Sequence, residues 1–123
     1  MGGSIVCVID DDASVRKALH RLLQASGFEV EVHENAASYL VRDRSRAPGC
    51  VLLDIKMPAM SGLEFQRQMA GAGRTPPIVF ITAHADEEAR AEAIALGAVD
   101  VLYKPLRQAV LLDAVRRALE RSA

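Results

Sequence analysis

Polar side chains stand directly after four of the short apolar runs in this chain. They comprise three successive carboxylates, a single carboxylate, a hydroxyl and an ammonium group: Asp10, Asp11, Asp12, Asp54, Thr82 and Lys104. Carboxylates at contact distance repel one another by about 4 kcal/mol at an effective dielectric of about 20. Such a cluster therefore either holds protons or binds a cation. Hard oxygen ligands of this kind suit Mg²⁺, which prefers carboxylates, water and phosphate.

A phosphoryl group is the substrate that this set of side chains would accept. Beside a cation, an ionised Asp54 can act as a nucleophile toward phosphorus and form an aspartyl phosphate. Lys104 offers a flexible point charge to a phosphoryl oxygen, and Thr82 offers a hydroxyl donor. Phosphoryl transfer depends mostly on positioning and charge neutralisation. The residue types therefore predict a phosphorylation switch centred on Asp54.

Each of these residues also has a plain structural interpretation. Asp12 directly precedes a helix-periodic run, which favours a helix N-cap over a metal ligand. Asp10 and Asp11 taken alone fit capping equally well, and Asp54 fits a turn at the end of a strand. Thr82 and Lys104 are uninformative one at a time. Only the joint placement of all these groups at strand ends supports a chemical site.

The elements that must position these side chains follow from the apolar pattern. Five runs are interpreted as strands: Ile5–Ile9, Glu29–His33, Cys50–Leu53, Ile78–Ile81 and Val99–Tyr103. Four of them are near-continuous in apolar residues, which is typical of strands buried in a parallel sheet. The second alternates valine with Glu29, Glu31 and His33, which predicts an edge strand.

Helical patterns occupy every gap between the strands. The helices are expected over Val15–Leu23 with a stop at Gly27, over Ala37–Val41 after an Asn35 cap, from a Ser61–Glu64 capping box, from Asp86 or Glu87 to Gly97, and over Leu111–Ala118. Strict alternation predicts one (βα)₅ domain over residues 1–123, a flavodoxin-like doubly wound parallel sheet with strand order 2-1-3-4-5. Sites in such sheets form beyond the carboxyl ends of the strands, so the polar residues should converge.

Composition narrows the classes of function. A net charge of −1 gives no global attraction to nucleic acid or membrane, and the arginines of 42–46 and 116–117 are expected on solvated helix faces. Cys7 and Cys50 lie in apolar runs, as small buried residues of a reducing compartment do. His20, His33 and His84 show no metal-ligand spacing and are expected at the surface. No apolar stretch approaches the roughly 18 residues of a membrane span, so a cytoplasmic location is expected.

Several motifs together resemble a two-component response-regulator receiver domain. They are Val8–Arg16, Val51–Pro58, Met60–Gly62, Val79–His84, and Gly97–Asp100 with Lys104-Pro105. The likeness covers essentially the whole chain and is greatest to the FixJ-type branch.

The resemblance implies a role for each site residue. Asp54 accepts the phosphoryl group from a phosphohistidine of a sensor histidine kinase. Mg²⁺ or Mn²⁺ is held by Asp11 directly, by Asp10 largely through water, by Asp54, and by the backbone carbonyl of Lys56. Thr82 is the switch hydroxyl and Lys104 contacts the phosphate, followed by a cis bond to Pro105. Lys56 and His84 tune the lifetime of the phosphoryl group.

The resemblance also implies partners. The output is expected to be transcription, through a C-terminal DNA-binding domain outside this chain or another target protein, with a phosphorylation-dependent homodimer. The receiver itself is expected neither to bind nucleic acid nor to be an enzyme beyond its own phosphotransfer and dephosphorylation.

This sequence departs from the family pattern at the switch aromatic. The usual aromatic position holds Val101, Tyr103 stands immediately before Lys104, and Leu106 follows Pro105. The phosphorylation chemistry is unaffected by these changes, but the family's aromatic rotation does not carry over. We expect Thr82 to move toward the phosphoryl group while the surroundings of Val101 and the fourth helix rearrange.

Two other classes remain as alternatives. Residues 10–14 resemble the nucleophile motif of haloacid-dehalogenase phosphatases, but that class expects an acidic pair after the lysine, and only the isolated Asp113 and Glu120 follow. It also leaves Asp54 without a role. A non-phosphorylated interaction module would take up no phosphate, although every residue needed for uptake is present.

Overall fold

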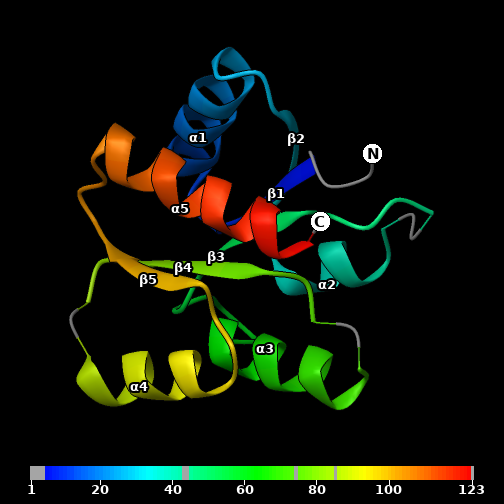
Figure 1. Cartoon of the computed structure of the whole chain (residues 1–123). Coiled ribbons are helices and arrows are strands. Elements are labelled where there is room, and N and C mark those ends of the chain that lie inside the picture. The colour runs from blue at the N-terminus through cyan, green and yellow to red at the C-terminus, as the bar shows by residue number, and fades with distance from the viewer. Residues whose placement is uncertain (1–4, 43–44, 74, 85, 123) are drawn as a thin grey trace.

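The computed structural model describes residues 5–42, 45–73, 75–84 and 86–122. Five parallel strands form one sheet in the order β2-β1-β3-β4-β5, so the predicted topology is confirmed (Figure 1). The elements are β1 Ile5–Ile9, α1 Ala13–Ala25, β2 Glu29–His33, α2 Ala36–Leu40, β3 Cys50–Asp54, α3 Gly62–Gly71, β4 Ile78–Thr82, α4 Glu87–Ala95, β5 Asp100–Tyr103 and α5 Gln108–Ser122.

Helices cover both faces of this sheet because side chains alternate along each strand. In β1, Val6 and Val8 face α1 and α5, where Leu23 and Leu111 pack against them. Cys7 and Ile9 face the opposite layer, which includes Tyr39 of α2 and Phe65 of α3. Figure 1 shows α1 and α5 on one side of the sheet and α3 and α4 on the other. The central strands are buried on both faces, as their continuous apolar runs predicted.

Two strands extend one residue beyond their predicted ends. The register pairs Asp54 with Ile81 and Thr82 with Tyr103, so each polar residue is still part of a ladder. β5 begins at Asp100, one residue later than predicted. The site residues Asp54 and Thr82 are therefore the last residues of strands, held by regular backbone pairing rather than by a loop.

The helix caps agree with the sequence pattern. Asp12 caps α1, and its side chain accepts hydrogen bonds from the backbone of Ser14 and Val15. Ser61 and Glu64 form the reciprocal capping box of α3, and Asp86 caps α4. Gly27 follows α1 with φ +93°, a left-handed conformation that ends the helix.

Two expectations about surface residues are wrong. The Arg42 side chain is only 9% exposed and pairs with Glu31 of β2, because α2 ends at Leu40 and the chain then turns back over the sheet edge. His33 is 9% exposed, because it lies on the face of β2 that α2 covers, edge-on to the Tyr39 ring. Arg116 is exposed as expected. Among the described residues, no helix is both long and apolar enough to cross a membrane.

Candidate functional site

Three carboxylates converge at the carboxyl ends of β1 and β3. Carboxylate oxygens of Asp10, Asp11 and Asp54 lie within 4.8 Å of one another. The strand order reverses between these two neighbours, which opens the crevice where sites form in such sheets. Asp10 is 2% and Asp54 8% exposed, whereas Asp11 is exposed. The structure thus brings Asp54 beside two adjacent aspartates that lie more than forty positions earlier in the sequence.

The backbone and α1 hold Asp10 in place. Its N–H donates to the carbonyl of His33 at 3.1 Å, and its Oδ1 accepts from the N–H of Asp12 at 2.9 Å. Arg16 donates from Nη1 to the Asp10 carbonyl at 2.7 Å. Sequence reasoning did not single out Arg16. The available signal was its place one turn into the helix that follows the acidic run.

Asp54 sits between a backbone donor and a cation. Oδ1 accepts from the N–H of Lys56 at 3.1 Å, and Oδ2 lies 3.5 Å from Nζ of Lys104. Burial raises the pKa of Asp54 above its usual range, with a contribution from Asp10, against the lowering effect of Lys56 and Lys104. Burial therefore outweighs the stabilisation that Lys56 and Lys104 give to the ionised carboxylate.

Lys104 bridges the two buried carboxylates from the end of β5. Its Nζ lies 3.4 Å from Oδ2 of Asp10, and its backbone N–H donates to the Thr82 carbonyl at 2.8 Å. Burial works to lower the pKa of Lys104, but attraction to Asp10 and Asp54 outweighs it and the pKa is raised. The side chain is therefore an ammonium ion at neutral pH. The bond from Lys104 to Pro105 is cis, as the resemblance implied.

The Thr82 hydroxyl lies on the strand next to Asp54 but is engaged elsewhere. Its Oγ1 accepts from the N–H of His84 at 3.1 Å and donates to the His84 carbonyl at 3.4 Å. The His84 side chain is exposed. Val101 is buried at 4% exposure, whereas Tyr103 is 38% exposed. The position of the usual aromatic is thus filled by a small buried side chain.

The loop after Asp54 approaches the strand closely. The N–H of Gly62 donates to the carbonyl of Ile55 at 2.8 Å, and a Cβ on Gly62 would lie 2.4 Å from the carbonyl oxygen of Asp54. Ala59 in the same loop has a left-handed backbone, φ +69°. Lys56 presents its backbone to Asp54 and its side chain is exposed. Sequence reasoning did not single out either Ala59 or this contact.

The donor set fits a hard divalent cation. One ammonium group at 3.4–3.5 Å offsets only part of the charge of three carboxylates. The raised pKa of Asp54 comes mainly from burial, with a smaller contribution from the neighbouring Asp10. Carboxylate and carbonyl oxygens suit Mg²⁺ or Mn²⁺. Asp10, Asp11 and Asp54 are thus arranged to hold such an ion. Asp54 is also the carboxylate that would accept a phosphoryl group.

Known proteins share this fold and residue pattern. A family model of the response regulator receiver domain matches residues 6–116. The chain belongs to the response-regulator receiver family, and therefore acts in two-component signal transduction. This assignment confirms the family that the motifs resembled and leaves the phosphatase alternative without support.

The relatives place the chain near FixJ. TodT, a response regulator protein of Pseudomonas putida, is 42% identical over 117 residues, which cover 95% of this chain and 52% of TodT. The transcriptional regulatory protein FixJ of Azorhizobium caulinodans is 41% identical, over 96% of this chain and 56% of FixJ. The crystal structure of FixJ-N is 35% identical with a TM-score of 0.88, covering 98% of this chain and 96% of that one. The chain spans about half the length of the curated relatives it matches.

Proposed function

We propose that this receiver accepts a phosphoryl group on Asp54 from a sensor histidine kinase and changes conformation in response. The observation that supports this most directly is the position of the Asp54 carboxylate. Asp54 is the last residue of the central strand β3. Its carboxylate lies within 4.8 Å of two further carboxylates and 3.5 Å from the Lys104 ammonium. Residues 1–123 then constitute one receiver domain.

The chemistry assigned to Asp54 is a direct transfer between side chains. A carboxylate oxygen of Asp54 forms a bond to phosphorus while the bond from phosphorus to the kinase imidazole breaks, and the imidazole takes up a proton. Lys104 pairs with a phosphoryl oxygen in place of part of its present contact with Asp54. Water later hydrolyses the aspartyl phosphate, at a rate tuned by the neighbouring Lys56 and His84. The chain carries out no other catalysis.

A divalent ion completes the site. Asp10, Asp11, Asp54 and the backbone carbonyl of Lys56 would hold Mg²⁺ or Mn²⁺, which supplies positive charge to the phosphoryl oxygens. Asp12 has no part in this set because both hydrogen bonds to its side chain come from the start of α1.

The switch would work through the Thr82 hydroxyl. In the unmodified chain this hydroxyl bonds the backbone of His84, so contact with a phosphoryl group requires it to leave those partners. Moving a population from 1:99 to 99:1 takes about 5.5 kcal/mol. Two new charged hydrogen bonds, from Thr82 and Lys104, contribute about 3–6 kcal/mol gross. Val101 and α4 then rearrange around the vacated space.

The output that we propose is transcription. The relatives include proteins named as transcriptional regulators, and the chain matches about half of their length. A C-terminal DNA-binding domain, or another target protein, would read the phosphorylated state, and phosphorylation would favour a homodimer. With a net charge of −1, the receiver itself does not bind nucleic acid. We assign it to the cytoplasm, where its kinase would meet it.

Phosphorylation of the purified chain tests the proposal. Incubation with Mg²⁺ and acetyl phosphate should add the mass of one phosphoryl group to the wild type and none to Asp54→Asn. Asp12→Asn is the matched control, because asparagine caps a helix as well as aspartate does. Uptake that persists in Asp54→Asn would rule out Asp54 as the acceptor. An equal loss in Asp12→Asn would show that the loss in Asp54→Asn is not specific to the acceptor position.

Thr82→Ala separates uptake from response. The variant should be phosphorylated like the wild type yet lose most of the conformational change, because the hydroxyl that contacts the phosphoryl group is gone. Backbone amide NMR shifts with and without beryllofluoride measure that change. Thr75→Ala, at an exposed loop threonine, should respond normally. A normal response from Thr82→Ala would show that the signal takes another route.

A further inference from the structure

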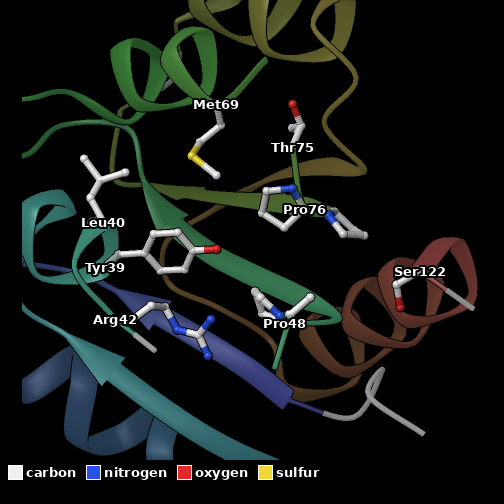
Figure 2. A pocket seen from close by; sticks show the side chains of 10 residues that line it. Tyr39, Leu40, Arg42, Pro48, Met69, Thr75, Pro76 and Ser122 are labelled. Atoms are coloured by element: carbon white, nitrogen blue, oxygen red, sulfur yellow. The ribbon is translucent and has the colours of Figure 1, made fainter. Parts of the chain in front are cut away.

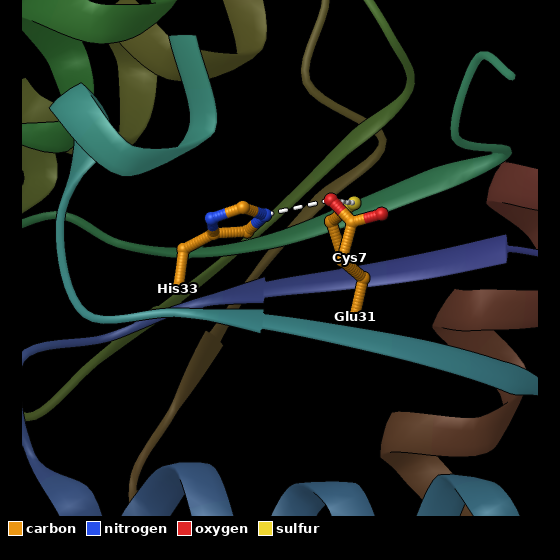
Figure 3. Close-up of side chains that lie close together, drawn as sticks. All are labelled: Cys7, Glu31 and His33. Carbon is orange, nitrogen blue, oxygen red and sulfur yellow. Dashed lines mark hydrogen bonds and ion pairs between the residues drawn. The ribbon is translucent and has the colours of Figure 1, made fainter. Parts of the chain in front are cut away.

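A second cluster of metal-ligand side chains lies on β1 and β2 and shares no residue with the acidic site. Cys7 pairs with Glu31 across the two strands, and Glu31 and His33 alternate onto the same face. One ligand atom from each of these residues lies within 4.8 Å of the others (Figure 3). We propose that Cys7, Glu31 and His33 form a binding site for a zinc-class divalent cation.

One pair of ligand atoms already has nearly the spacing of a tetrahedral site, and a second pair is closer than such a site requires. Ligands about 2.0–2.3 Å from a tetrahedral zinc ion lie roughly 3.3–3.5 Å from one another. Sγ of Cys7 is already 3.6 Å from Oε2 of Glu31. Nε2 of His33 lies 2.7 Å from the same oxygen, so this pair must separate by about 0.6 Å to admit an ion. A rotation of the carboxylate provides that movement.

Outer partners already orient two of the three ligands. Nδ1 of His33 lies 2.7 Å from the Ser38 hydroxyl, which leaves Nε2 facing the cluster. Nη2 of Arg42 donates to Oε1 of Glu31 at 2.7 Å, which leaves Oε2 toward Cys7 and His33. Hydrogen bonds of this kind, from a second layer of residues to the ligands, are typical of built metal sites. They are independent of the convergence of the ligand atoms themselves.

Arg42 is the group that a cation would partly displace. Its Nε also donates to Oε2 of Glu31, and that contact gives way to the metal while the bond to Oε1 persists. The Cys7 thiol loses its proton to solvent as the sulfur–metal bond forms. The proton that Nε2 of His33 now donates to Glu31 must also leave Nε2, and a proton on Nδ1 then donates to the Ser38 hydroxyl. The thiolate and the Glu31 carboxylate together balance the two charges of the ion, and Arg42 keeps its own. Glu31, whose side chain is 34% exposed, provides the entry path from solvent.

The ligand types separate this site from the acidic one. Thiolate and imidazole ligands prefer Zn²⁺ or Co²⁺, whereas an all-oxygen set prefers Mg²⁺ or Mn²⁺. Cys7 and Glu31 also belong to neighbouring strands, one of them the sheet edge. A bound ion would therefore tie the edge strand β2 to the strand that leads into Asp10 and Asp11.

Titration of the reduced, Mg²⁺-saturated chain with Co²⁺ tests the site. We expect one equivalent to produce a thiolate-to-cobalt absorption band with the visible bands of tetrahedral cobalt, and Zn²⁺ to remove them. Cys7→Ser and His33→Gln should lose the thiolate band and the tetrahedral bands, respectively. Ser38→Ala should bind about tenfold more weakly, because the imidazole loses its outer partner.

Matched controls make each result decisive. Cys50→Ser changes the other fully buried cysteine and should keep both signals, as should Asp54→Asn. Circular dichroism establishes that each variant is folded, and His33→Gln decides the question if Cys7→Ser does not fold. The proposal is wrong if the folded wild type gives no thiolate band, or if the bands survive in His33→Gln.

A cavity near this cluster does not support a second binding-site proposal. A cavity of about 400 Å³ has Tyr39, Leu40, Arg42, Pro48 and Met69 among its lining residues (Figure 2). Its wall is mostly apolar, and the Arg42 guanidinium beside it is already bonded to Glu31. Nothing in the described residues identifies an occupant.

Discussion

Three successive aspartates have three different environments in this chain. Asp10 is buried and faces Lys104, Asp11 is exposed at the mouth of the acidic cluster, and Asp12 caps α1. Their types are identical, so their roles follow from where the strand stops and the helix starts. Asp10 is the first residue after β1 and still bonds the His33 backbone, which keeps its side chain inside the site.

Ala59→Gly should stabilise the chain. A left-handed backbone costs an L-residue about 1–2 kcal/mol, and the extra freedom of glycine in the unfolded state offsets about 0.4–1 kcal/mol. With φ at +69°, we expect a net gain of about 0.5–1 kcal/mol in the free energy of unfolding. Urea denaturation measures it. Ala70→Gly, at an exposed position inside α3, should instead lose stability. Equal losses of stability in the two variants would show that the left-handed backbone of Ala59 does not cost stability.

At the scale of the element, α3 determines how closely the loop after Asp54 folds against the sheet. Its capping box holds the first turn, and Gly62 lets that turn contact the backbone of β3. The helix also contacts α4, where Gln66 donates to the Ala93 carbonyl at 3.0 Å. The strand that carries the proposed phosphoacceptor and the helix expected to move are therefore both in contact with α3.

Gly62→Ala should destabilise the chain although alanine is the better helix former. The new Cβ would lie 2.4 Å from the Asp54 carbonyl oxygen and 3.0 Å from a ring carbon of Phe80, so backbone and core must shift. We expect a loss of about 1–3 kcal/mol. Gly71→Ala, in the last position of the same helix with open space around it, should gain about 0.5–1 kcal/mol. Thermal unfolding of both variants checks this contrast, and a similar change in the two would refute it.

The capping box predicts a pH-dependent contribution of α3. Hydrogen bonds with Ser61 hold the pKa of Glu64 below its ordinary value of 4.5. The ionised carboxylate therefore stabilises the folded chain above that value, and the contribution is lost as the pH falls through the folded pKa. Glu64→Gln should thus differ most from wild type near neutral pH and converge with it in acid. Ser61→Ala should cost about 1 kcal/mol at neutral pH. Urea unfolding at several pH values measures both, and a constant difference would contradict the assignment.

At the scale of the whole molecule, charged side chains cover the edge strand β2 of the sheet. Glu29 and Glu31 of β2 pair with Arg46 and Arg42 from the segment after α2. Charged groups on an edge also discourage pairing with a second chain. The two pairs differ in burial, since the Arg42 side chain is 9% and the Arg46 side chain 52% exposed.

The two arginines should therefore differ in their contribution to stability. Arg42→Ala leaves Glu31 without its main partner, and we expect a loss of about 1–2 kcal/mol, reduced from the value for a fully buried pair because solvent reaches the carboxylate. Arg46→Ala should cost clearly less than Arg42→Ala, because water screens an exposed pair. Chemical denaturation at low and high salt distinguishes them, and equal costs would show that burial does not matter here.

Local pattern was sufficient for the elements and for the residues of the acidic site. Near-continuous apolar runs located four strands, period-two alternation located the edge strand, and period-3.6 spacing located the helices. The capping residues Asp12, Ser61 and Asp86 marked helix starts. All these signals act over a few neighbouring residues. The crossover rule for parallel strands then predicted a doubly wound sheet, and five strands in such a sheet suit the order 2-1-3-4-5. It also predicted which strand ends meet, and hence that Asp10, Asp11, Asp54, Thr82 and Lys104 gather at one edge.

Tertiary structure alone decided how side chains from distant segments meet. The burial of Arg42 and His33 and the cluster of Cys7 with Glu31 have no local signature. The clash expected at Gly62 depends on the distance between a helix and a strand, not on either sequence. Sequence periodicity reports which face of an element is apolar. It does not report which partner lies opposite, because that is set by the packing of all elements together.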